Sequence, residues 1–135
     1  MPRQADLRRF HVVAGILRDP SGRVLIAERV DGGPFHGLWE FPGGKIHEHE
    51  VPEIALAREL SEEIGVVPVA AELFMSIAHE YPDRHVTIEF FLVSEWKNEP
   101  TGLEGQALRW ISTDELDAEQ LLPADESVIR ALRTI

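Results

Sequence analysis

Three glutamates stand close together in the chain, at positions Glu59, Glu62 and Glu63. In a helix, which turns about 100° per residue, they would project within one arc of roughly 100°. Like charges at this spacing repel one another, and the last turns of a helix favour cations over anions. A hard divalent cation, Mg²⁺ or Mn²⁺, would reverse both penalties, because carboxylate oxygens are its preferred ligands. On this geometry alone, an ordinary solvated acidic face remains an equal alternative.

The charge of the whole chain limits what such a site could bind. The 135 residues include 13 Lys or Arg and 24 Asp or Glu, for a net charge of −11, and no cysteine. This acidity argues against DNA, RNA or an anionic membrane as a partner. A polyanionic substrate would therefore need positive charge from a metal. The absence of cysteine excludes disulfides and thiol catalysis, and it favours a cytoplasmic location.

The glutamates must be positioned by a mixture of strands and helices in one domain spanning 1–135. Runs typical of strands occupy residues 10–17, 24–30, 73–81, 86–96 and 108–111. We expect the first two to form a hairpin around 19–22, and the next two to form another around 82–85. The clearest helix covers 51–64, with Pro52 in its first turn and Gly65 just past its end. Shorter helices are expected over 113–121 and 125–133, which gives an α+β fold.

The spacing around the glutamates is more specific than the glutamates themselves. Gly44, five residues, Glu50, seven residues, Arg58-Glu59-Leu60, one residue, Glu62-Glu63, one residue and Gly65-Val66 follow one another. This pattern resembles the signature of the Nudix hydrolase family at every position. The resemblance implies an αβα sandwich with a mixed β-sheet between helices, and a loop–helix–loop that holds Mg²⁺ against a diphosphate.

Further segments at 39–46, 81–85, 104–106 and 122–126 are similar to the MutT-type members of this family. That similarity implies hydrolysis of a nucleoside triphosphate by water attack at the β-phosphorus, giving the monophosphate and pyrophosphate. The expected best substrate is 8-oxo-dGTP, so the activity would cleanse the nucleotide pool and protect DNA. The expected cofactor is Mg²⁺, for which Mn²⁺ can substitute. We expect a small-molecule nucleotide as the partner, and a monomer or weak dimer.

The resemblance also implies roles for individual residues. The metal ligands would be Gly44, through its carbonyl, and Glu59, Glu62, Glu63 and Glu104. The same glutamates would be catalytic, together with Arg58, which is placed to hold the carboxylates in shape. Arg29 would bind phosphate, and Phe41, Arg84 and Asp125 would surround the base.

Asp125 departs from the pattern of the MutT-type members, which the resemblance implies would have an asparagine there. An amide both donates and accepts, as the N7–H and O6 of 8-oxoguanine require, whereas an ionised carboxylate only accepts. A protonated Asp125 could serve both atoms, while an ionised one would suit the N4 amino group of cytosine. Asp125 could instead simply cap the last helix.

Three other functions stay open at this point. The first is hydrolysis of CTP, dCTP or modified cytidine nucleotides. The second is a catalytically silent nucleotide sensor, which the complete carboxylate set argues against. The third is ADP-ribose hydrolysis, which fits the C-terminal similarity poorly.

Overall fold

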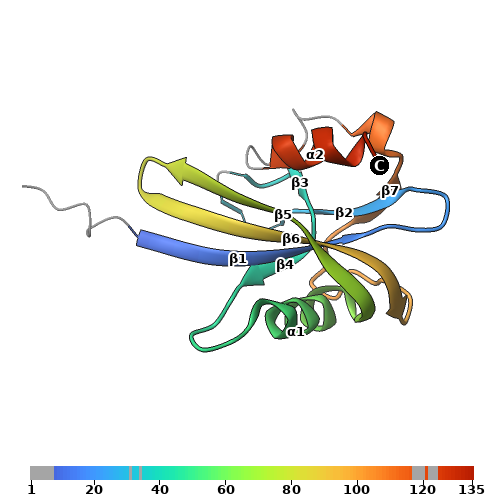
Figure 1. Ribbon diagram of the computed structural model, residues 1–135, viewed down its shortest axis with the longest axis horizontal. Coiled ribbons are helices and arrows are strands. Elements are labelled where there is room, and N and C mark those ends of the chain that lie inside the picture. The colour runs from blue at the N-terminus through green and yellow to red at the C-terminus, as the bar shows by residue number, and fades with distance from the viewer. Residues whose placement is uncertain (1–7, 31, 34, 117–120, 122–124) are drawn as a thin grey trace, which may run out of the picture.

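The protein is a layered structure in which strands lie between two helices (Figure 1). The computed structural model describes residues 8–30, 32–33, 35–116, 121 and 125–135. One helix, α1 (Pro52–Ile64), lies on one side of the strands, and α2 (Glu126–Leu132) lies on the other. The expected α+β sandwich with a mixed sheet between helices is therefore confirmed. None of the helices described is long and apolar enough to cross a membrane.

The strands form two sheets. The four-stranded sheet has the order β4-β1-β6-β5 and the three-stranded sheet the order β3-β2-β7. Within the first sheet β1 and β6 run parallel and the other pairs run antiparallel. The strands are β1 (Arg8–Leu17), β2 (Val24–Glu28), β3 (Trp39–Glu40), β4 (Gly43–Lys45), β5 (Val67–Tyr81), β6 (Arg84–Lys97) and β7 (Leu108–Ile111).

The predicted hairpin between residues 10–17 and 24–30 is wrong. β1 pairs along its whole length with β6, and β2 pairs with β3 and β7 in the other sheet. Only one isolated bridge, between Arg18 and Val24, joins the two segments directly. The C-terminal half of β1 is buried on both faces, which is typical of a central strand with a neighbour on each side. The turn at 19–22 therefore carries the chain from one sheet to the other.

The helix predicted over 51–64 is confirmed as α1. Pro52 opens its first turn, and Gly65 ends it in the left-handed conformation at φ 71°. There the Gly65 N–H caps carbonyls of the last turn. One face of α1 is buried against the four-stranded sheet through Ala55, Leu56, Leu60 and Ile64. Glu59, Glu62 and Glu63 lie outside this buried cluster, on the adjacent face of the helix.

Two further expectations have different outcomes. The hairpin around 82–85 is confirmed by the antiparallel pairing of β5 with β6. The helix expected over 113–121 is wrong, because only a 3₁₀ turn forms, at Thr113–Glu115, and Leu116 is already extended. Residues 117–120 lie outside the described chain. Leu116 and Leu121 are both buried in the core on the α2 side.

Candidate active site

The junction of β4 and α1 is built on two glycines. A Cβ atom on Gly43 would lie 2.0 Å from the Val13 carbonyl oxygen of β1. A Cβ on Gly44 would lie 2.5 Å from the Glu59 carboxylate. The Gly43 contact is with backbone, so only glycine there lets β4 pair with β1; the Gly44 contact is with a side chain, so glycine there leaves room for Glu59 to lie against the backbone.

Arg58 holds two carboxylates in place beside α1, those of Glu50 and Glu59. Its Nε and Nη2 donate to the two oxygens of Glu50 at 2.9 Å each, and Nη1 donates to Glu59 at 2.8 Å. Arg58 is the main cause that lowers the pKa of Glu50 to about 2. Arg58 thus holds carboxylates as expected, but chiefly Glu50 and Glu59. Its i+4 neighbour Glu62 stands 3.6 Å away and is 58% exposed.

A cavity of about 280 Å³ opens at the end of α1. Four carboxylates line it from four separate segments of the chain: Glu28, Glu40, Glu63 and Glu104. Arg29, the predicted phosphate-binding residue, and Gly43 of β4 also line this cavity. The structure thus brings Glu63 and Glu104 together across 41 positions of sequence, whereas Glu62 points to the outside.

Glu63 is the most perturbed group of this cavity. Burial, joined by the charges of Glu59, Glu40 and Glu104, raises the pKa of its carboxyl to about 8, against one opposing hydrogen bond from Gly43 N–H. Its Oε2 is buried and accepts no hydrogen bond from the described residues. A buried acceptor without a partner is costly, and a cation would relieve that cost.

The side chains of the predicted ligands do not all converge on one point in this conformation. In the part of the chain that the structure covers, no three acidic or histidine side chains converge closely enough to hold an ion as they stand. Glu59 is turned to Arg58, and Glu62 is turned to solvent. Binding of an ion by the predicted set would therefore require these two side chains to rotate.

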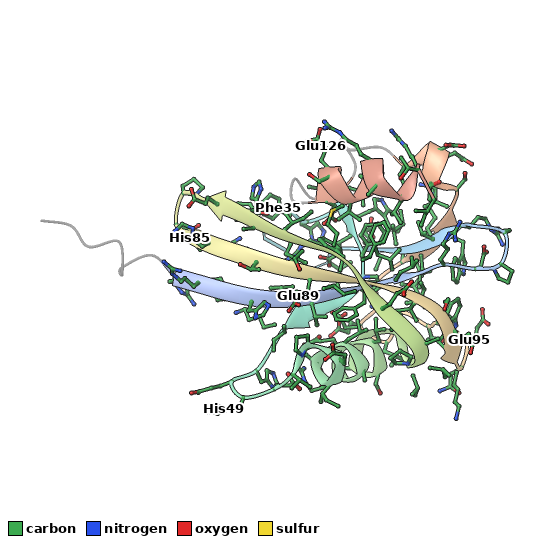
Figure 2. The ribbon with its side chains drawn as sticks, in the orientation of Figure 1. Phe35, His49, His85, Glu89, Glu95 and Glu126 are labelled. Atoms are coloured by element: carbon green, nitrogen blue, oxygen red, sulfur yellow. The ribbon has the colours of Figure 1, made fainter. Side chains whose placement is uncertain are left out.

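A second cavity, of about 380 Å³, adjoins the first, and Arg29, Glu40 and Gly43 line both. Its walls are largely apolar, from β1 and β6 (Val12, Ala14, Val86, Ile88 and Phe90). The three residues expected around a base, Phe41, Arg84 and Asp125, all line this cavity. Phe35 closes one side beside β5, with its ring 6.0 Å from that of Tyr81 (Figure 2).

Asp125 is the one charged group in the buried core of the described chain. It is 4% exposed, and its Oδ2 has no hydrogen-bond partner in the ranges described. It stands at the N-cap position of α2, but its side chain makes no capping hydrogen bond. The capping explanation is therefore wrong. Burial raises the pKa of Asp125 to about 8, with a smaller contribution from Glu40.

Sequence reasoning missed several residues of these cavities. In the sequence, nothing marks Glu40, between Trp39 and Phe41, as a site residue. In the structure, Glu40 accepts a 3.1 Å hydrogen bond from Arg29 and lines both cavities. Glu28 was also missed, and Gln106 and Tyr81 were noted only as parts of similar segments. Nothing in the period of β2 could have revealed Glu28, since a charge at the end of a strand is usually a surface group.

The chain is similar to several known proteins. A family model described as NUDIX domain matches residues 13–131. The 8-oxo-dGTP diphosphatase of Escherichia coli (strain K12) is 40% identical over 96% of this chain and 100% of its own. The CTP pyrophosphohydrolase of the same organism is 33% identical over 96% of this chain and 95% of its own. A solved MutT structure, from Aliivibrio salmonicida or Vibrio cholerae, has a TM-score of 0.79 at 29% identity, covering 93% of this chain and 97% of that one.

Proposed function

The chain belongs to the Nudix domain family, and we propose that it is a Mg²⁺-dependent pyrophosphohydrolase of nucleoside triphosphates that prefers 8-oxo-dGTP. The observation that carries this proposal is the adjacency of two cavities of opposite character. One is lined by carboxylates and the other by apolar side chains with Asp125, and Arg29 lines both. A nucleoside triphosphate has the same division into a charged and an aromatic part.

The donor set of the first cavity fits a hard divalent cation. The predicted ligands are the carboxylates of Glu59, Glu62, Glu63 and Glu104 and the carbonyl of Gly44, all oxygen donors. Glu63 and Glu104 line this cavity, and Glu59 and Glu62 would join them by rotating their side chains. The buried, unpartnered Oε2 of Glu63 and the raised pKa of its carboxyl support a nearby positive charge. A cation bound there would neutralise phosphate oxygens and polarise the attacked phosphorus. Mg²⁺ is the proposed ion, and Mn²⁺ the proposed substitute.

The residues of the chain supply the remaining functions in this proposal. Arg29 binds a phosphate, and its 3.1 Å hydrogen bond to Glu40 holds the guanidinium between the two cavities. Arg58 acts indirectly, through the hydrogen bonds by which it fixes Glu50 and Glu59. Glu104, which lines the same cavity, would accept a proton from the attacking water. The products are the nucleoside monophosphate and pyrophosphate.

Asp125 supports an oxidised purine as the preferred base. A carboxyl group with a pKa of about 8 is largely protonated at neutral pH. It can then donate to O6 and accept from N7–H of 8-oxoguanine, which removes the mismatch of an ionised aspartate. Phe41 and Phe90, in edge-to-face contact at 6.2 Å, provide the apolar part of the same cavity.

Hydrolysis of CTP is the second candidate. It is favoured by the 33% identity to a CTP pyrophosphohydrolase and by the carboxylate that Asp125 becomes at higher pH. At neutral pH the protonated form lacks the negative charge that would favour the N4 amino group of cytosine, whereas it matches both N7–H and O6 of 8-oxoguanine, so we place this candidate second.

The direct test is pyrophosphate release from 8-oxo-dGTP with Mg²⁺, with EDTA, and with Mn²⁺ added back after EDTA. We expect turnover with either ion and none with EDTA, because a chain of charge −11 lacks the positive charge to hold a triphosphate alone. Full turnover in the presence of EDTA would refute the metal assignment. Release of orthophosphate in place of pyrophosphate would refute the proposed bond cleavage.

A further inference from the structure

The side chain of Gln106 connects two parts of the carboxylate cavity. Its Nε2 donates to the Glu63 carbonyl at the end of α1, at 3.0 Å, and its Oε1 accepts from the Glu104 N–H at 2.9 Å. Gln106 itself is part of the cavity wall. One amide therefore spans from the helix that carries Glu63 to the loop that carries Glu104.

Among the described residues, the backbone N–H groups of 103, 104 and 105 each donate one hydrogen bond. Glu104 and Gly105 are exposed, and Gly105 has a φ of 81°. Among the described contacts, the backbone of 103–105 is held by Leu103 N–H to the Glu63 carbonyl, at 3.1 Å, and by Gly105 N–H to the Gly102 carbonyl, at 3.2 Å. Within the described part of the chain, the Gln106 side chain is the one hydrogen-bond partner of the Glu104 backbone.

The chemistry at this position requires an amide. One end must donate to a carbonyl and the other must accept from an N–H, which neither a carboxylate nor an ammonium can do. A carboxylate there would also add a negative charge beside Glu63 and Glu104, whose proximity already raises the pKa of Glu63. The close approach of Gly102, where a Cβ would lie 2.1 Å from the Gln106 carbonyl oxygen, packs the loop around this residue.

We propose that Gln106 is a positioning residue, whose side-chain amide holds the Glu104 carboxylate at the cavity opposite Glu63 so that both can share one cation. The proposal rests on the proposed function, since it assigns a task to a group of the same site. Gln106 acts through Glu104 and needs no contact with the reacting atoms. Loss of its amide should weaken cation binding in the same way as loss of the Glu104 carboxylate.

The test is a Mn²⁺ titration of the full chain, followed by the EPR signal of free Mn²⁺, for four proteins. These are the wild type, Gln106→Met, Glu104→Gln and the double variant. Methionine keeps the length of glutamine and removes both hydrogen bonds. We expect each single variant to bind Mn²⁺ about 10-fold or more weakly, as is typical for residues that orient metal ligands. The double variant should bind no more weakly than Glu104→Gln.

Asn98 provides the matched control. Its Nδ2 donates to the Gly65 carbonyl at 3.3 Å, so it also ties this loop to the end of α1, but it does not contact Glu104. Its φ of 76° makes Asn98→Gly the variant that removes the bond without backbone strain. We expect Asn98→Gly to keep the Mn²⁺ affinity of the wild type within about twofold.

Three results would overturn the proposal. They are an unchanged Mn²⁺ affinity in folded Gln106→Met, a further loss in the double variant, and an equal loss in Asn98→Gly. If Gln106→Met does not melt cooperatively, Gln106→Ala takes its place under the same criteria. The titration needs no substrate. A wild type that binds Mn²⁺ but hydrolyses no triphosphate would refute the proposed function and leave the inference on Gln106 standing.

Discussion

Arg58 and Glu50 form a two-pronged ion pair in which Nε and Nη2 of the guanidinium each donate to one carboxylate oxygen at 2.9 Å. The third arm of the same guanidinium, Nη1, donates to Glu59 at 2.8 Å. The pair thus fixes the direction from which Glu59 approaches the backbone of Gly44. A single planar group holds two carboxylates that would otherwise repel each other.

Replacement of Arg58 by lysine should therefore impair catalysis although the charge is kept. A lysine cannot bind Glu50 through two donors and reach Glu59 at the same time. We expect kcat of Arg58→Lys to fall about 10- to 100-fold, with a higher Mg²⁺ concentration for half-maximal rate. Arg130→Lys is the control, because Arg130 forms an exposed i,i+4 pair with Glu126 at 2.7 Å, away from both cavities. An equal loss in the two variants would contradict the role of Arg58.

Glu63→Gln should stabilise the metal-free protein while it abolishes activity. The folded-state pKa of Glu63 is about 8, above its ordinary 4.5, so ionisation costs stability progressively as pH rises from about 4.5 to 8. The glutamine removes that cost. In EDTA we expect equal stability near pH 4 and a gain of ~1–3 kcal/mol at pH 8, measured by urea unfolding.

Glu62→Gln is the control for that experiment. Glu62 is largely exposed, so its replacement should leave the stability nearly unchanged at either pH. Both variants should lower kcat by orders of magnitude if both are ligands. A large loss of stability in metal-free Glu63→Gln would mean that this residue is structural.

The base preference should depend on pH through Asp125. Below its pKa of about 8 the protonated carboxyl suits 8-oxoguanine, and above it the carboxylate suits cytosine. We expect the ratio of kcat/KM for 8-oxo-dGTP to that for CTP to fall as pH rises from 7 to 9.5. One mismatched hydrogen bond is worth roughly 1–3 kcal/mol, or about 5- to 150-fold.

Asp125→Asn separates this effect from other titrations. The amide cannot ionise, so the ratio of variant to wild-type activity on each substrate cancels the ionisation of substrate, water and metal ligands. We expect the variant to keep 8-oxo-dGTP hydrolysis at pH 7, to exceed the wild type at pH 9.5, and to hydrolyse CTP poorly at both. If Asp125→Asn changes kcat/KM by the same factor for all substrates at every pH, another residue recognises the base.

His49 offers a prediction about folding alone. It has a φ of 65° in the loop before α1, and its side chain is 89% exposed next to Glu48 (Figure 2). A left-handed backbone favours glycine, and an exposed ion pair contributes little. His49→Gly should raise the free energy of unfolding by about 0.5–1 kcal/mol. His47→Gly is the control and should not stabilise. A destabilised His49→Gly would show that the side chain matters more than the backbone.

Local patterns predicted the local parts of this fold. The apolar period of residues 51–64, with Pro52 and Gly65 at its ends, defined α1 almost to the residue. The pairing of β1 with β6 could not be read in this way, because its register joins Arg8 to Arg84 across most of the chain. Adjacent strand-like runs with a turn between them favour a hairpin locally, and the burial of β1 on both faces overrides that preference.

The site was predictable only to the extent that its residues lie in recognisable segments. The signature and the resemblance pointed to Arg29, Phe41, Arg84 and Asp125, and the structure brings all four to one cavity. They could not reveal Glu40 or Gln106, whose tasks arise from contacts with distant segments. Nor could they show that Asp125 is buried without a capping bond, since that depends on the tertiary packing around α2.

The base preference is measured as kcat/KM for pyrophosphate release at pH 7 with Mg²⁺, compared among 8-oxo-dGTP, dGTP, CTP and dCTP. Because a buried, protonated Asp125 can pair with both N7–H and O6, we expect 8-oxo-dGTP to exceed dGTP, CTP and dCTP by about 10-fold or more. A preference for CTP or dCTP at this pH, or equal rates on all four substrates, would contradict the account.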